Sequence, residues 1–421
     1  MDRREFLKLT GIAGLGLVTP MIPRSAWATA AAGEPYSGTF WVFVQATGGW
    51  DPTSLCDPKG NRGEVDSDPM NKAYHHDDIQ TAGPIHYAPV GYNDTFFSKY
   101  QNQLLVLNGV DMQTNGHDSG RRHAFSGSLK ELQPCLPALL AHAAAPSAAL
   151  SFISNGGYDH TAGLVAPTRV DDTGSLTNLA YPDRIQPGST TDTWHSEATH
   201  ARLNKAIADR QARQLAKVTL PIEERAMNAL FTARSGRNEL KRLTEFLPAE
   251  LDPVRMKRQA QVAVASYKAG ITVAATITQG GFDTHNNHDQ SHIPRLASLL
   301  EGVDFLVEEA ERQGIADQMV VMVGSDFGRT PGYNENNGKD HWSVGSMLLM
   351  GKGIRGGRVL GATTERHRPL TVNPQTLELD ENGIRLKPAH VHRAIHRAAG
   401  ITELEALRRH PVDGENLDLL T

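Results

Sequence analysis

Short apolar runs along the chain alternate with polar, glycine-rich loops. Buried strands are predicted at 39–46, 103–109, 149–154, 271–278, 318–324 and 343–353. These runs are rich in β-branched, aromatic or long aliphatic residues, and turn-forming residues bound them. Residues 293–313 instead carry apolar residues at helical spacing, and a polar loop joins them to the strand at 271–278. The order strand, loop, helix predicts an open α/β sheet.

Residues 196–268 interrupt this alternation with a long helical pattern that has charged faces. We interpret this segment as a helical insertion, a hairpin or lid, within a single domain over 29–421. The stretch 388–400 predicts a further amphipathic helix, which ends at Gly400. Its His392 and His396 lie four positions apart, and we interpret them as exposed residues of one helix face.

The first 28 residues have the three parts of an export signal in order. Arg3 and Arg4 precede a short apolar stretch, and Ala-Trp-Ala at 26–28 fits a small-x-small cleavage site. The segment resembles a twin-arginine signal peptide, and its apolar run is too short to span a bilayer comfortably. We therefore expect residues 1–28 to be removed and the mature chain to be periplasmic or secreted.

Composition excludes several classes of protein. The formal net charge of −5 argues against a nucleic-acid binder, which would show a basic stripe. Cys56 and Cys135 form no disulfide framework, and whether they pair stays open. Neither cysteine lies in the C-x-P-x-R context from which sulfatases make formylglycine. The chain has no H-E-x-x-H segment, which disfavours a zincin-type protease.

Four of the predicted strands are followed by Asp and His side chains. These residues are Asp51 after the first strand; His117, Asp118, Ser119 and His123 after the second; Asp283, His285, His288 and His292 after the strand at 271–278; and Asp326, with Asp340 and His341 further on, after the strand at 318–324. Loops at the carboxyl ends of strands bind ligands in open α/β sheets. Imidazole and carboxylate are the usual ligands of divalent metals, so the pattern predicts a one- or two-metal hydrolytic site.

The order GGWD, HDSG, GGFDTHNNH, SDFGRTP and GKDHW resembles the DUF1501 family of exported proteins. By similarity that family belongs to the alkaline phosphatase superfamily. The resemblance covers most of the mature chain and is densest in 41–58, 104–128 and 271–361. It implies a mostly parallel central sheet flanked by helices, as in alkaline phosphatases and sulfatases. It also implies a metal-dependent hydrolase that acts on small or polymeric phosphate or sulfate esters.

The resemblance further implies a role for individual residues. Asp51, Asp283, Asp326 and His341, with His285 or His288, would hold a divalent metal such as zinc, calcium or manganese. Ser119 is the nucleophile candidate at a predicted helix start, where the helix dipole favours an anion. His117 and His123 are the alternative functional residues of that loop. Arg329 would bind an anionic group of the substrate, or else form a salt bridge to a neighbouring carboxylate.

Two departures from the superfamily pattern keep a second interpretation open. The expected Asp-His pair is Asp326-Phe327 here, and one residue separates Asp283 from His285 where three are usual. The alternative is a non-catalytic binding or structural relative that retains a partial metal site. The sequence specifies neither the substrate, the number of metals nor a protein partner.

Overall fold

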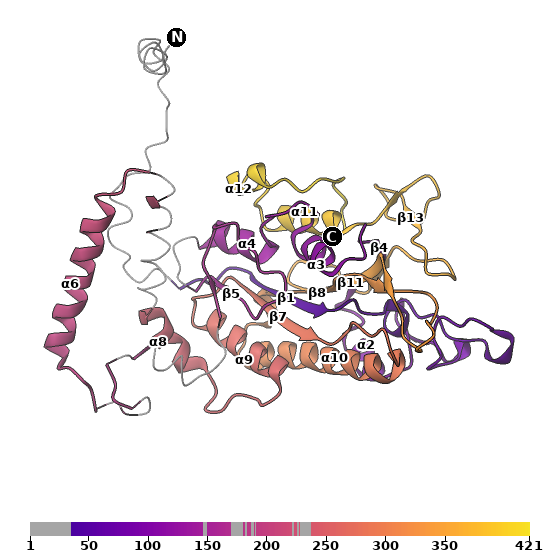
Figure 1. Cartoon of the computed structure of the whole chain (residues 1–421), viewed down its shortest axis with the longest axis horizontal. Helices are drawn as coiled ribbons and strands as arrows, with labels where there is room; N and C mark the ends of the chain where they lie inside the picture. Colours follow the sequence, from indigo (N-terminus) through magenta and orange to yellow (C-terminus); the bar gives the residue numbers. More distant parts are fainter. Residues whose placement is uncertain are drawn as a thin grey trace, which may run out of the picture.

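The computed structural model describes residues 35–145, 150–169, 191–220 and 237–421, with isolated positions between 180 and 227. The predicted signal segment, with Arg3 and Arg4, lies outside the described residues, so its removal stays a prediction. An eight-stranded sheet forms the centre of the molecule, in the order β12-β4-β11-β8-β1-β7-β5-β6 (Figure 1).

The strands of this sheet are β1 (Phe40–Thr47), β4 (Leu105–Asp111), β5 (Phe152–Ile153), β6 (Pro167–Thr168), β7 (Ala274–Gly280), β8 (Met319–Ser325), β11 (Val344–Gly351) and β12 (Arg358–Leu360). Only β11 pairs antiparallel with its neighbours, β4 and β8, and the other pairs in the sheet are parallel. The predicted α/β class with a mostly parallel sheet is therefore confirmed. Short pairs are β2 (Gln80–Ala82) with β3 (Ile85–Tyr87), β9 (Gly328–Arg329) with β10 (His341–Trp342), and β13 (Thr371–Val372) with β14 (Ile384–Arg385).

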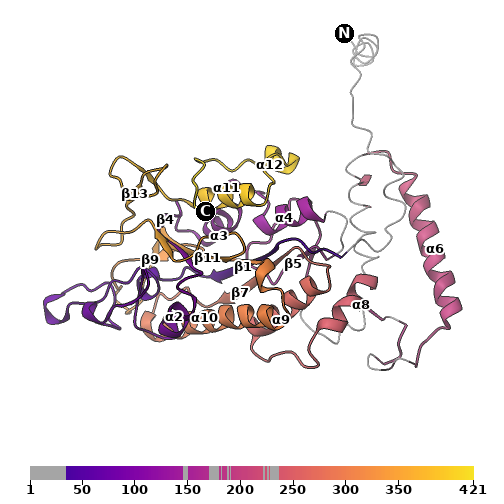
Figure 2. The same cartoon turned by 180° about the vertical axis from the view of Figure 1, so that it is seen from behind.

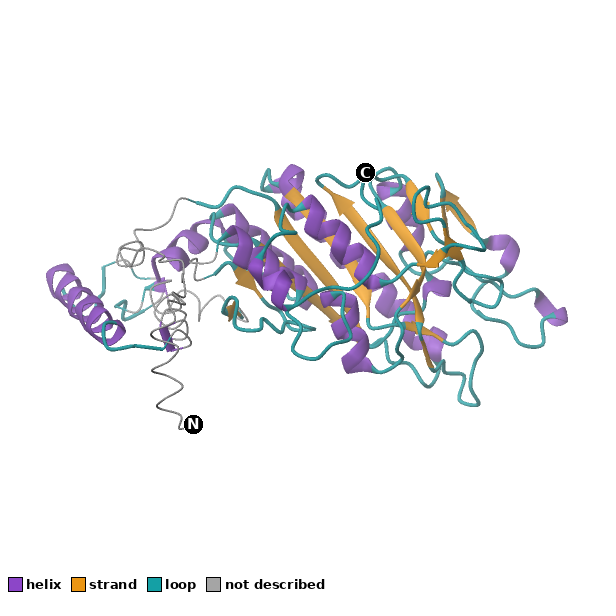
Figure 3. Ribbon diagram, turned by 90° about the horizontal axis from the view of Figure 1, so that it is seen from above, coloured by secondary structure: helices purple, strands orange, loops and turns teal. Residues whose placement is uncertain are grey.

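Helices cover both faces of the sheet, and β1 shows why. Successive side chains of a strand point to opposite faces. Val42 and Val44 lie in one core with α2 (Asn93–Tyr100), α9 (Arg255–Lys268) and α10 (His288–Arg312). Trp41 and Phe43 lie in a second core with α3 (His117–Ser126), α4 (Leu136–Ala144) and α11 (Pro388–Ala398). The short helix α12 (Glu405–Arg409) follows α11 in the chain. Figure 3 shows the strands side by side with helices lying across them.

The predicted insertion at 196–268 contains helices of different kinds. α6 (Glu197–Leu215) has no buried residue and stands away from the sheet in Figures 1 and 2. α8 (Arg237–Phe246) packs through Leu243 on residues of α9. α9 itself belongs to the main core, since Ala260, Ala263 and Val264 are buried with β1. None of the described helices is long and apolar enough to cross a membrane.

The histidines of α11 correct one expectation. His392 and His396 are buried rather than exposed. His392 Nε2 donates to the Ala124 carbonyl of α3 at 2.9 Å. The prediction of an exposed pair was wrong because α3, which covers this helix face, comes from a distant part of the chain.

We expect these two buried histidines to make the protein sensitive to acid. Burial lowers the pKa of His392 to about 3 and that of His396 to about 4, while a histidine in the unfolded chain has a pKa of about 6.5. Between about pH 6.5 and 4 the unfolded chain therefore binds more protons than the folded protein does. The free energy of unfolding falls as the pH drops through this range. The loss at a pH of about 4.5 is on the order of 2 kcal/mol for each histidine.

The measurement is the free energy of unfolding in urea at neutral and acidic pH, for the wild type and for His396→Gln. The variant has one titrating group fewer, so it should lose less stability between the two conditions. His195→Gln, at an exposed position, serves as the control and should behave as the wild type does. Equal losses in wild type and His396→Gln would contradict the assignment.

Candidate metal centre

One edge of the sheet gathers side chains from loops that are far apart in sequence. The strands β1, β4, β7 and β8 run in the same direction, so their carboxyl ends lie at this edge. Because β11 is antiparallel, the residues before it return to the same edge. Five side chains meet there: His117, Asp283, His285, Asp326 and His341. We call the segment 281–287 the Asp283 loop and the segment 330–343 the His341 loop.

The Asp283 carboxylate is the point on which three imidazoles converge. His285 Nε2 lies 2.9 Å and His341 Nε2 3.1 Å from Asp283 Oδ1. His117 Nε2 lies 3.3 Å from Asp283 Oδ2. The Nε2 atoms of His285 and His341 are themselves only 3.1 Å apart.

The other ring nitrogen of each histidine has an acceptor that fixes its orientation. His341 Nδ1 lies 2.8 Å from the Asn115 carbonyl, which only accepts, so this nitrogen carries a proton. His117 Nδ1 lies 2.8 Å from Asp326 Oδ2, and His285 Nδ1 lies 2.7 Å from Asp340 Oδ1. A neutral imidazole that donates from Nδ1 has its lone pair on Nε2. In the neutral state of all three rings, three lone pairs therefore point at one carboxylate.

This arrangement requires positive charge at its centre. Burial disfavours ionisation of Asp283, but the hydrogen bond from Arg329 and its positive charge outweigh it and hold the pKa of the carboxyl below its usual range. Hydrogen bonding to His285 likewise lowers the pKa of Asp340. Lone pairs and a carboxylate at such short distances repel one another unless a cation or added protons lie among them.

The residues present fit a metal ion. Ligand atoms of His117, Asp283 and His341 all lie within 4.8 Å of one another. His117 Nε2 and Asp326 Oδ1 are buried without a hydrogen-bond partner, which an otherwise well-bonded protein rarely tolerates. Imidazole nitrogens with a carboxylate suit zinc and related divalent ions, and Nδ1 hydrogen bonds to carboxylates or carbonyls are typical of metal-ligating histidines.

Arg329 joins three segments behind the centre. Its guanidinium is fully buried and donates to the Gly49 carbonyl at 2.8 Å, the Lys339 carbonyl at 3.0 Å and Asp283 Oδ1 at 2.8 Å. It also donates to the Gly48 carbonyl. The salt bridge that the sequence left open is therefore present, and a substrate-binding role for Arg329 stays a prediction.

Asp326 lies beneath the centre rather than beside Asp283. Its Oδ2 accepts from the Gly48 backbone N–H at 3.0 Å as well as facing His117. Phe327 is buried, and its ring packs against the rings of His117 and His341 at centroid distances of 4.9 and 4.5 Å. Asp326 thus orients His117, in the way that an outer carboxylate orients a metal-ligating histidine.

The structure places the other catalytic candidates away from these contacts. Ser119 Oγ lies 2.6 Å from Thr114 Oγ1 and donates to the Gly116 carbonyl, both within its own loop. His123 is buried, donates from Nδ1 to the Met112 carbonyl, and has a pKa lowered by burial. Cys56 and Cys135 are both free and buried, and burial raises the pKa of the Cys56 thiol to about 12.

Asp51 and His288, two of the predicted ligands, belong to a separate buried network. Asp51 Oδ2 accepts from Lys339 Nζ at 2.6 Å and faces His288 Nε2 at 3.1 Å. Asp51 Oδ1 accepts from the backbone N–H and the hydroxyl of Thr53, and Asp51 thereby caps the short helix Pro52–Ser54. Both carboxylate oxygens therefore have partners within the protein, and a metal role for Asp51 and His288 stays a prediction.

Sequence reasoning counted Asp340 among the strand-end residues but gave it no role of its own, and it did not include Asn115 or Lys339. Asp340 had a usable signal, because it directly precedes a predicted ligand at a strand end. The Asn115 carbonyl had no such signal, because every residue has a backbone carbonyl and the residue type does not show which one accepts a hydrogen bond.

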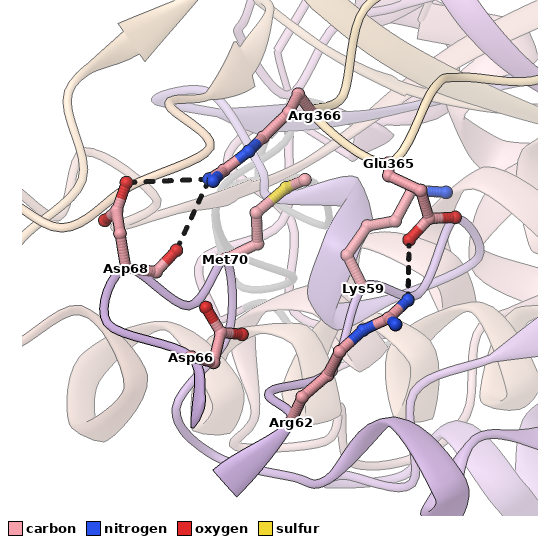
Figure 4. A pocket seen from close by; sticks show the side chains of 8 residues that line it. Lys59, Arg62, Asp66, Asp68, Met70, Glu365 and Arg366 are labelled. Atoms are coloured by element: carbon pink, nitrogen blue, oxygen red, sulfur yellow. Dashed lines mark hydrogen bonds and ion pairs between the residues drawn. The ribbon is translucent and has the colours of Figure 1, made fainter. Parts of the chain in front are cut away.

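A charged pocket of about 250 Å³ lies between the loop after β1 and the loop after β12 (Figure 4). Its lining consists of Lys59, Gly60, Arg62, Asp66, Asp68, Met70, Glu365 and Arg366. Arg62 pairs with Glu365 at 3.4 Å and Arg366 with Asp68 at 3.6 Å, and all four side chains are exposed. No residue of the metal centre lines this pocket, so the two features are separate.

The model of one protein family, described as a protein of unknown function (DUF1501), matches residues 147–378. The chain belongs to this family. The DUF1501 match spans Asp283, His285, Asp326, Asp340 and His341, while His117 precedes it. No curated protein sequence matches the chain.

Several solved structures are similar to this DUF1501 chain at low identity. Ps i-CgsB, solved in complex with k-i-k-neocarrahexaose, is 10% identical with a TM-score of 0.41, over 91% of this chain and 76% of that one. The lipoteichoic acid synthase LtaP from Listeria monocytogenes is 8% identical with a TM-score of 0.37, over 91% and 75%. The PsFucS1 sulfatase from Pseudoalteromonas sp. is 11% identical with a TM-score of 0.37, over 88% and 69%.

Proposed function

We propose that this protein is an exported, metal-dependent hydrolase of phosphate or sulfate esters. The observation that carries the proposal is the convergence of three imidazole Nε2 atoms on the Asp283 carboxylate, each ring oriented by a partner at Nδ1. Such a donor set binds a divalent cation, with zinc, manganese and calcium as the candidates.

In this proposal the ligands are His117, Asp283, His285 and His341. Asp326 and Asp340 keep the Nδ1 protons of His117 and His285 in place. When bound, the metal would polarise a phosphoryl or sulfuryl oxygen and lower the pKa of a water molecule. We leave Asp51 and His288 out of the ligand set because partners within the protein already engage them.

The chain's own residues also define how an ester would be placed. Arg121 is 33% exposed and holds its Nε 3.9 Å from Asp326 Oδ2, which puts positive charge beside the centre. The helix α3 begins at His117 without a side-chain cap, so its first backbone N–H groups are available to an anion. Water is the favoured nucleophile over Ser119, whose hydroxyl is held by Thr114 and Gly116.

One observation favours a second function, metal binding without turnover. Phe327 packs an apolar ring against both His117 and His341, so this position offers no ligand atom to a metal. A single metal, with the Ser119 hydroxyl engaged by Thr114 and Gly116, suits a binding protein as well as it suits a hydrolase.

The experiment is elemental analysis of the purified chain, followed by assays with aryl phosphate and aryl sulfate esters. A hydrolase is expected to bind about one equivalent of metal and to lose turnover with a chelator. Re-addition of zinc or manganese should restore that turnover. Bound metal without turnover of any ester would favour the binding protein. Folded protein without metal would overturn both proposals.

Export through the twin-arginine route completes the proposal. Arg3, Arg4 and the small-x-small site at 26–28 support it. The test is cell fractionation of the wild type and of a chain with both arginines replaced by lysine, which should stay in the cytoplasm.

A further inference from the structure

A closed ring of hydrogen bonds lies buried directly behind the metal centre. We call it the buried ring: Asp51, Thr284, His288 and His292 close the cycle, and Lys339 is attached to it at Asp51. His288, His292, Asp51 and Lys339 are fully buried, and Thr284 is 6% exposed. These buried side chains are all polar or charged, so the ring calls for an explanation.

The proton positions around the ring follow from its fixed donors. The Asp51 backbone N–H donates to His292 Nε2 at 2.9 Å, so His292 carries its proton on Nδ1. His292 Nδ1 then donates to Thr284 Oγ1 at 3.2 Å, and the hydroxyl donates to His288 Nδ1 at 2.7 Å. His288 Nε2 in turn donates to Asp51 Oδ2 at 3.1 Å. Both imidazoles are neutral in this pattern, and burial lowers the pKa of each.

Lys339 supplies the charge that balances Asp51. Its Nζ lies 2.6 Å from Asp51 Oδ2, and both side chains have no exposed surface. Burying such a pair costs most of what the charges gain from each other, so a well-packed apolar pair would stabilise the fold as well. The geometry that the buried ion pair fixes therefore explains its presence better than a gain in stability does.

The ring's members are next to the metal ligands in both loops. Thr284 lies between Asp283 and His285, and Lys339 directly precedes Asp340 and His341. The Lys339 backbone N–H donates to the Thr284 carbonyl at 3.1 Å, which ties the two loops at the same point. A shift of either residue would move ligands on both loops.

We propose that the buried ring is a positioning device that holds the Asp283 loop and the His341 loop in the register that brings their ligands together. This inference rests on the proposed metal centre and assigns Asp51 and His288 to its support rather than to the metal. Outer-shell residues of this kind typically change metal affinity by about 10- to 100-fold when they are replaced.

Two pairs of variants test the ring. Lys339→Met removes the ion pair, and Lys99→Met is its matched control, because Lys99 pairs with Asp304 at 2.6 Å between α2 and α10. Thr284→Val removes the hydroxyl from the ring, while Thr284→Ser keeps it. We expect Lys339→Met and Thr284→Val to bind zinc about 10- to 100-fold more weakly than the wild type. Lys99→Met and Thr284→Ser should bind it with near wild-type affinity, measured where all variants are folded.

A second readout needs no metal. Long-range nitrogen–proton spectra of protein with ¹⁵N-labelled histidine report which ring nitrogen of His285 and His341 carries the proton. The wild type should show the Nδ1–H form for both, and Lys339→Met and Thr284→Val should lose it, even if no metal binds and the proposed function fails. Unchanged spectra in both variants would overturn the positioning role. If the wild type binds zinc, wild-type zinc affinity in both variants would overturn it as well.

Discussion

Replacement of Asp283 with asparagine is expected to remove metal binding almost completely. Asp283 is the one carboxylate that all three Nε2 atoms approach, so its charge holds the cation at the point where the rings converge. Because loss of an outer-shell partner alone weakens metal binding by about 10- to 100-fold, loss of this ligand should exceed about 100-fold. The measurement is metal content after purification, together with a zinc titration of the chelator-treated protein.

The same substitution also affects the fold, and this effect has to be separated from metal loss. Buried Arg329 donates to Asp283 and would lose its carboxylate acceptor. We expect the free energy of unfolding to fall by about 1–3 kcal/mol, typical for loss of a hydrogen bond between charged groups. Circular dichroism establishes whether Asp283→Asn is folded under the conditions of the titration.

A second variant keeps the Arg329 contact intact. His341→Gln leaves Asp283 and Arg329 paired but removes one Nε2 from the centre, so it should weaken zinc binding without the same loss of stability. Asp317→Asn, an exposed residue before β8, is the control for the change of charge. Wild-type metal content in folded Asp283→Asn would show that the metal, if any, binds elsewhere.

Replacement of Gly338 with alanine is expected to separate the two ligand-bearing loops. Gly338 is buried, and a Cβ at this position would fall on the carbonyl group of His285 and lie 2.5 Å from the Asn286 backbone nitrogen. Backbone atoms cannot rotate away as a side chain can, so the Asp283 loop must move. Overpacking of this kind costs about 1–3 kcal/mol, and we expect zinc affinity to fall at least about tenfold, as for other shifted ligands.

Gly324→Ala is the matched control for this steric effect. Gly324 lies in β8, and a Cβ there would meet Met347 and Phe125 side-chain atoms at 3.6 Å, an ordinary packing distance. Thermal unfolding and zinc titration of both variants compare the two sites directly. If Gly338→Ala bound zinc as the wild type does, the register of the loops would not determine the metal centre.

Local patterns in the sequence were enough to predict the scaffold of this site. The runs at 271–278 and 318–324 predicted β7 and β8, and the polar residues after them predicted where Asp283, His285 and Asp326 would lie. These predictions succeed because strand periodicity and strand ends are properties of neighbouring residues. The placement of His341 followed less directly, since it depends on the reversed direction of β11.

The proposed division between metal ligands and supporting residues could not be predicted from the sequence. Asp51 follows β1 in the same way that Asp283 follows β7, yet the first is buried with Lys339 and the second faces three imidazoles. His285 and His288 are only three positions apart in the sequence, but they belong to different networks. Residue type and spacing are alike in these cases, so neither could separate the roles.

The sequence by itself determined that strand ends rich in Asp and His meet at one edge of an α/β sheet. Tertiary structure alone decided which of those side chains face each other, and which are neutral and buried. The physical reason is that a ligand's orientation depends on the partner of its second ring nitrogen, such as the Asn115 carbonyl for His341. Likewise, burial of His392 and His396 depends on α3, whose approach no local pattern records.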